Sequence, residues 1–214
     1  MIRVYLEVGK RRVFASAADW PGWTRSGKDE KSALEALAAA APRYAHAAKA
    51  ARIPFAPGST FDIVERLPGD ATTEFGAPGA LAKADFKRLT KKEAGRLSAL
   101  VAASWTVLDR VVETAPSSLR KGPRGGGRDR DQIVEHVLGS ETSYARKLGL
   151  RLQQPAVGDA AAVREHRNAI VAGLRAGTKG VTERGWPARY LARRMAWHAL
   201  DHAWEIEDRS TQQL

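Results

Sequence analysis

The chain has 214 residues, of which 43% are hydrophobic and 28% charged, and it carries a formal net charge of +11. This composition is typical of a soluble globular protein, and no apolar run approaches the roughly 18 residues that a membrane-spanning helix needs. Because the chain has no cysteine, disulfides, cysteine nucleophiles and thiolate metal sites are excluded, so a bound transition metal would be held by histidine and carboxylate side chains.

The N-terminal part has the pattern of a small mixed domain. Residues 2–8 alternate between apolar and polar side chains, which predicts a strand. This start lacks the apolar stretch of a secretory signal, so we expect a cytoplasmic location. The further elements expected are a strand over 13–17, an Ala-rich helix over 31–51 that Pro42 kinks or breaks, and a short strand over 61–66. Together they predict a β-β-α-β domain over residues 1–78.

Two segments of this domain carry a family resemblance. The turn DWPGW and the later run SGKDEKSALEAL resemble the small domain of HicB-like antitoxins, which have a comparable proline-glycine turn before a helix. The resemblance covers residues 2–66 and implies a regulatory module with a protein partner. HicB-like proteins usually add a short DNA-binding segment, and the sequence has no match to one.

Beyond residue 79 the pattern becomes helical. Apolar residues recur at three- and four-residue spacings, which predicts four amphipathic helices. The expected spans are 91–114, from Asp129 or Asp131 to Gly149, 159–176 with an end at Gly177, and 187–209. Thr90 and Glu93 form a capping box for the first of them. Four such helices with short connections predict an all-α four-helix bundle over residues 79–214, and the whole chain is then an α+β protein.

The positive charge is concentrated in this second part. Nine of the eleven excess positive charges lie after residue 80, and several belong to the Gly-rich segment RKGPRGGGRDR, residues 120–130. A basic loop of this kind can hold phosphate groups or an anionic cosubstrate, and a solvated surface loop is the alternative. The sequence has no helix-turn-helix, zinc-finger or aromatic RNA-binding pattern, so nucleic acid is not the expected partner.

Three of the five histidines suggest a metal site. His198 and His202 are four residues apart in the last predicted helix, so their side chains lie one turn apart on one face and can chelate one ion. Ala199 stands where a zincin protease has glutamate, which disfavours that activity. His136, on the core-facing side of the second helix, offers a third ligand. Three histidines with open positions predict a catalytic site, and ordinary packing of buried histidines is the alternative.

Two acidic residues lie close to this histidine pair. Asp201 and Glu205 follow in the same predicted helix, and either could orient an imidazole ring from behind. A solvated helix face is the alternative for both.

A second resemblance rests on three segments of the helical part. WTVLDRVVE, DRDQIVEHVLGSETSY and MAWHALDHAWEIED resemble the DinB/YfiT-like proteins, over residues 85–210. The resemblance implies a four-helix bundle that binds a divalent metal, zinc, nickel or iron, through His136, His198 and His202. It also implies a glutamate near Glu141 and relatives that act with low-molecular-weight thiols.

The sequence therefore predicts a metal-binding protein, and the resemblance implies a metal-dependent thiol S-transferase, hydrolase or isomerase acting on a small molecule. The metal would deprotonate a thiol or a water molecule. Arg194 and the 120–130 loop would hold an anionic cosubstrate, and no catalytic acid or base is identified. The N-terminal domain would pack over the bundle or form a homodimer. The alternative is a regulatory or antitoxin-like module that binds a protein or nucleic-acid partner, with the bundle as scaffold.

Overall fold

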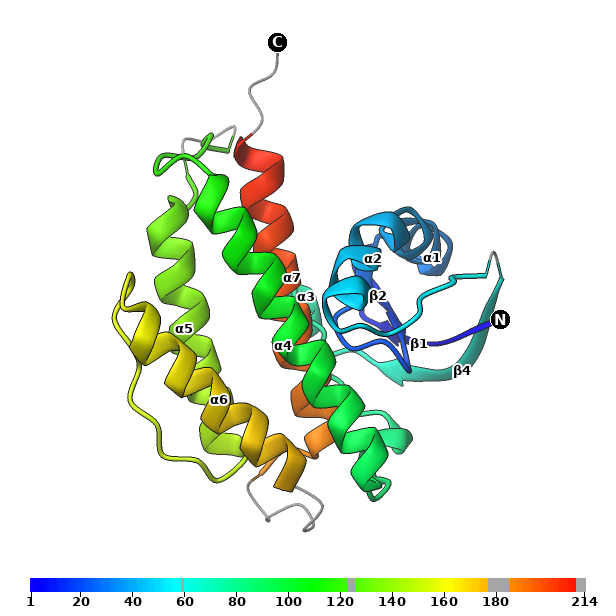
Figure 1. Ribbon diagram of the computed structural model, residues 1–214. Coiled ribbons are helices and arrows are strands. Elements are labelled where there is room, and N and C mark those ends of the chain that lie inside the picture. Colours follow the sequence, from blue (N-terminus) through cyan, green and yellow to red (C-terminus); the bar gives the residue numbers. More distant parts are fainter. Residues whose placement is uncertain (59, 123–125, 177–184, 211–214) are drawn as a thin grey trace.

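The computed structural model describes residues 1–58, 60–122, 126–176 and 185–210. A four-stranded sheet with two helices at the N-terminus is followed by a helical half (Figure 1). The structure therefore confirms that the chain contains both a sheet and helices, as the sequence predicted. The strands, in chain order, are β1 (Ile2–Val8), β2 (Val13–Ala17), β3 (Thr24–Gly27) and β4 (Phe61–Pro68).

The sheet has the order β3-β2-β1-β4, with β1 antiparallel to β2 and parallel to β4. Strand β3 pairs antiparallel with β2 and was not expected from the sequence. Its four residues, Thr-Arg-Ser-Gly, have no alternation of apolar and polar side chains that could have revealed it. The predicted β-β-α-β order is therefore corrected to β-β-β-α-α-β.

Two helices replace the single helix expected over residues 31–51. Helix α1 (Glu30–Ala39) and helix α2 (Ala41–Ala50) meet at Ala40, and Pro42 lies in the first turn of α2. Proline is tolerated there because the first turn needs no N–H, whereas inside a continuous helix its ring would clash with the preceding turn. The sequence predicted that Pro42 either kinks or breaks the helix, and the structure confirms a break.

The segment that joins the two halves is folded against both. It contains helix α3 (Ala71–Phe75) and the short 3-10 helix η1 (Lys83–Phe86), neither of which was expected. The buried carboxylate of Glu7 in β1 accepts hydrogen bonds from the backbone N–H groups of Gly79 and Ala80, both at 2.9 Å. This carboxylate fixes the connection at the point where the helical half begins.

The long helices of the second half are close to their predicted spans. They are α4 (Lys91–Thr114), α5 (Arg130–Lys147), α6 (Ala160–Ala176) and α7 (Ala188–Ser210). Helix α4 begins and ends where expected, and Thr90 and Glu93 form the predicted capping box. Asp129 is the N-cap of α5, which decides between the two predicted starts. The predicted stop at Gly177 lies outside the described residues.

Helix α7 lies between the sheet and the other long helices. It packs against α4, α5 and η1, and α4 also packs against α6 and α2. On its other side the ring of Trp197 meets Phe14 of β2 edge-on, with centroids 6.2 Å apart, and Arg193 lies 4.5 Å from the ring of Tyr5 in β1. Buried residues of both halves belong to one continuous cluster. None of the helices in the described part of the chain could span a membrane.

A buried ion network joins three of the long helices. Arg167 of α6 contacts both carboxylate oxygens of Glu141 in α5, each at 3.2 Å, and of Asp109 in α4, at 2.8 and 3.0 Å. The side chain of Glu141 is only 2% exposed. A charge this deeply buried is stable only while its partner is present.

We expect Arg167→Met to lower the free energy of unfolding by about 3–5 kcal/mol, because it leaves Glu141 buried and unpaired. Adding Glu141→Leu should restore part of that loss, since the unpaired charge is then also gone. Urea unfolding measures both values. Arg164→Met, at an exposed position of the same helix, is the control and should change stability by about 0.5 kcal/mol or less. A loss below about 1 kcal/mol for Arg167→Met would contradict this account.

Candidate metal centre

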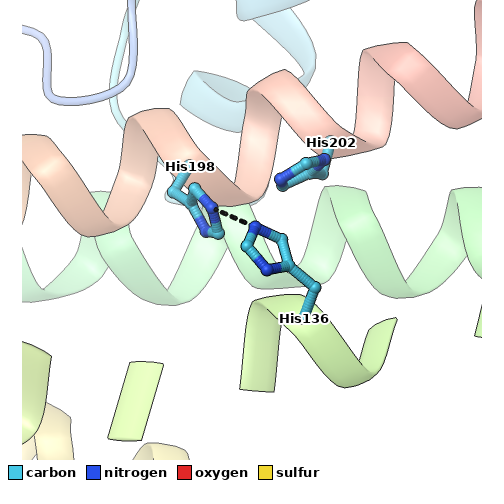
Figure 2. A group of neighbouring side chains, drawn as sticks. All are labelled: His136, His198 and His202. Atoms are coloured by element: carbon cyan, nitrogen blue, oxygen red, sulfur yellow. Dashed lines mark hydrogen bonds between the residues drawn. The ribbon is translucent and has the colours of Figure 1, made fainter. Parts of the chain in front are cut away.

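Two helices bring the three predicted histidines together. His198 and His202 lie on consecutive turns of α7, and His136 lies two turns into α5, which packs against α7. Figure 2 shows the three rings facing one another in the space between the helices. His198 is buried, and the other two are partly buried. The helical spacing seen in the sequence and the packing of α5 on α7 together produce this convergence.

The distances between the rings are short. The Nε2 atoms of His136 and His198 are 3.2 Å apart. Each histidine can offer one ring nitrogen such that all three nitrogens lie within 4.8 Å of one another. An ion bound tetrahedrally at about 2.05 Å holds two nitrogen ligands roughly 3.3 Å apart. The pair His136 and His198 therefore already has the spacing of two ligands on one ion.

The surroundings keep two of these imidazoles neutral. Burial, together with the nearby rings of His202 and His136, holds the pKa of His198 well below its usual value. Burial and His202 also lower the pKa of His136. Neutral imidazole has a free lone pair and is the form that binds metal ions. At neutral pH both side chains are therefore ready to act as ligands.

Glu205 orients the third histidine. Its Oε2 atom accepts a hydrogen bond from Nδ1 of His202 at 2.7 Å, and its Oε1 atom pairs with Arg209 at 2.6 Å. A carboxylate can only accept, so the Nδ1 atom of His202 carries a proton, and in the neutral form of the ring the lone pair is then on Nε2. The hydrogen bond from His202 is the main reason why the pKa of Glu205 lies below its usual value. Of the two acidic residues singled out in the sequence, Glu205 is the one that contacts a histidine.

The other acidic candidates have different partners. Asp201 points to the sheet and pairs with Arg25 of β3 at 2.9 Å. Glu141, which the family resemblance associates with the site, is paired with Arg167 instead. Neither contacts the histidines through an interaction that the structure shows.

A basic pocket lies beside Glu205. It has a volume of about 580 Å³ and is lined by Arg120, Lys121, Gly122, Gly126, Gly127, Glu205 and Arg209. It therefore includes part of the basic loop expected over residues 120–130, while residues 123–125 lie outside the described part. Within it, Lys121 is paired with Asp129 at 2.6 Å, and Arg209 with Glu205. Two of the basic side chains of this pocket are thus paired with carboxylates of the chain itself.

Arg194 lies one turn before His198, between two aromatic rings. Its Cζ atom is 5.0 Å from the ring of Trp197 and 5.8 Å from the ring of Tyr144. Trp186 lies against Tyr144, with ring centroids 5.2 Å apart. The roles of Tyr144 and Trp186 were not expected, because they approach α7 through tertiary packing that has no periodic signal in the sequence.

Comparisons of the chain with protein-family models, with curated proteins and with solved structures gave no match. The chemistry of this site is therefore argued from its own residues.

Proposed function

We propose that this protein binds one divalent transition-metal ion, zinc, nickel or iron, through His136, His198 and His202, with α4 to α7 forming a four-helix bundle of the DinB/YfiT type. The observation that carries the proposal is the convergence of three imidazole nitrogens from two helices within 4.8 Å. Imidazole suits each of these metals. Ligand sites inside helical bundles are commonly built from side chains of facing helices in this way.

The residues around the histidines fit a metal site better than a packed core. Two of the rings are kept neutral by burial and by the nearby His202, and His202 itself is oriented by Glu205. A carboxylate behind a histidine is the usual outer partner of a metal ligand, since it fixes the tautomer and raises the basicity of the ring. The alternative of ordinary packing explains the burial of His198 and the ion pair of Glu205 with Arg209, but it does not explain why three imidazole nitrogens converge.

The proposed chemistry is activation of a nucleophile. Three protein ligands leave a position for a water molecule or a thiol, and a bound metal would lower the pKa of either one. A thiol S-transferase, a hydrolase or an isomerase would use such a site. In this proposal the protein keeps His136 and His198 neutral by burial, and Glu205 orients His202.

The regulatory alternative has weaker support. A nucleic-acid partner at the basic pocket would need free cations there, yet Lys121 and Arg209 are both paired with carboxylates. Arg43 of α2 is likewise paired, with Glu207 and Asp208. A protein partner for the N-terminal domain is compatible with the metal site, and so is a homodimer.

Elemental analysis of untagged protein should find one zinc, nickel or iron ion per chain. Metal at about 100 times its dissociation constant should raise Tm by about 5–10 °C, because binding to the folded state alone adds about 2.7 kcal/mol. His198→Ala should remove both the bound ion and the shift in Tm. His46→Ala, at an exposed position of α2, is the matched control and should keep both. Unchanged metal content in His198→Ala would refute the proposed site.

Glu205→Gln tests the orientation of His202. An amide can donate as well as accept and carries no charge, so we expect metal affinity to fall about 10–100-fold, as is usual when the outer partner of a ligand is lost. Competition with a chromogenic chelator measures the change. Glu135→Gln removes an equal charge from an exposed position beside His136 and should change the affinity much less. Equal effects of the two variants would show that only net charge matters.

A further inference from the structure

Arg194 is a partly buried cation that has no acidic partner in the described part of the chain. Its Nη1 atom donates a hydrogen bond to the carbonyl oxygen of Pro78 at 2.8 Å, and its Nε atom is buried with no partner. The preceding arginines of α7 differ in having acidic partners, since Arg193 pairs with Asp85 and Arg189 with Glu93, although the Nε atom of Arg189 is also buried with no partner. A buried charge or donor without a partner is unfavourable, so it needs an explanation.

The surroundings of Arg194 connect it to the candidate metal centre. Trp197 lies 5.0 Å from its Cζ atom and 6.0 Å, between ring centroids, from His198. Tyr144 lies 5.8 Å from the same Cζ atom and 5.9 Å from the His198 ring. The same two aromatic side chains therefore flank both the guanidinium group and a proposed ligand. The hydroxyl of Tyr144 has no hydrogen bond from the residues that the structure describes.

We propose that Arg194 binds the carboxylate of a small organic anion whose other end reaches the metal, so that the substrates of this site are carboxylate-bearing molecules. The inference rests on the proposed metal-binding function and adds the substrate class to it. A planar guanidinium group matches a carboxylate in shape and charge. Aromatic walls beside it exclude water and so strengthen the attraction. Arg194 lies one helical turn from His198, which suits a molecule of a few carbon atoms.

The basic pocket beside Glu205 is a weaker candidate for the same role. Lys121 and Arg209 in it are already paired with carboxylates, and Arg120 is exposed. An exposed arginine is well hydrated and needs no partner, whereas the buried Nε atom of Arg194 has lost its water. Arg194 has no acidic partner in the described part of the chain and lies between two aromatic rings that also flank His198, which favours it as the anion-binding residue.

The test compares two thiols on protein loaded with cobalt(II). 3-Mercaptopropionate and 3-mercapto-1-propanol have the same chain length and differ in the carboxylate, and binding of either is followed by thiolate-to-cobalt absorption. The wild-type protein should bind the carboxylate-bearing thiol on the order of tenfold more tightly, as expected for one charge-assisted hydrogen-bonded pair. Arg194→Gln should abolish the preference, and Arg164→Gln, on the exposed side of α6, should keep it.

The outcomes separate this inference from the metal site itself. Equal affinity of the wild-type protein for the two thiols overturns the role of Arg194 and leaves the metal site standing. Failure to bind cobalt overturns both. A preference that survives Arg194→Gln but is lost in Arg120→Gln assigns the anion to the basic pocket and also overturns the inference. If Arg194→Gln lowers Tm strongly, Arg194→Met keeps an apolar stem between the two rings and should give the same loss of preference.

Discussion

The structure depends on the burial of helix α7 on both sides. Six consecutive residues, Met195 to Leu200, are all buried, which an ordinary surface helix with one apolar face would not allow. The sheet covers one side through Phe14 and Tyr5, and α4 and α5 cover the other. A helix held in this way cannot rotate about its axis without breaking one of the two contacts. Its orientation therefore fixes where His198 and His202 point.

The same burial explains how the charges of α7 are arranged. Arg193 reaches the buried carboxylate of Asp85 in η1, a pairing that links the connecting segment to the helix. Asp201 is satisfied by Arg25 of β3, whose guanidinium group also lies 4.1 Å from the ring of Trp204. On the sheet side, then, charges are paired across the two halves. On the side of α5 the polar groups are instead three imidazoles, of which burial keeps His136 and His198 neutral, and an arginine without an acidic partner in the described part of the chain. The face of α7 toward α5 is therefore the one on which we place the candidate metal site.

Local signals in the sequence predicted much of the fold and the core of the site. The capping box at Thr90 and Glu93 fixed the start of α4, and the four-residue spacing of His198 and His202 placed both on one face. Strand β3 was not predicted because its residues, Thr-Arg-Ser-Gly, have no alternation of apolar and polar side chains, and its formation depends on pairing with β2. The sequence also did not predict that Tyr144 lies against Arg194 or that Glu141 pairs with Arg167, because both contacts join residues more than 20 positions apart. Spacing along one helix predicts which side chains share a face, but it contains no information about what lies opposite.

The contact between His136 and His198 has two physical descriptions, and His202 distinguishes them. As a hydrogen bond between neutral rings, the 3.2 Å contact needs one Nε2–H donor and one Nε2 acceptor. His202 then remains unexplained, because its Nδ1 proton is directed to Glu205 and its Nε2 lone pair has no donor. A cation accepts one lone pair from each of the three rings at once, so the Nε2 atom of His202 then also has a partner. On this argument Glu205, whose hydrogen bond orients the His202 ring, is the feature that favours the proposed metal site over a packed cluster of histidines.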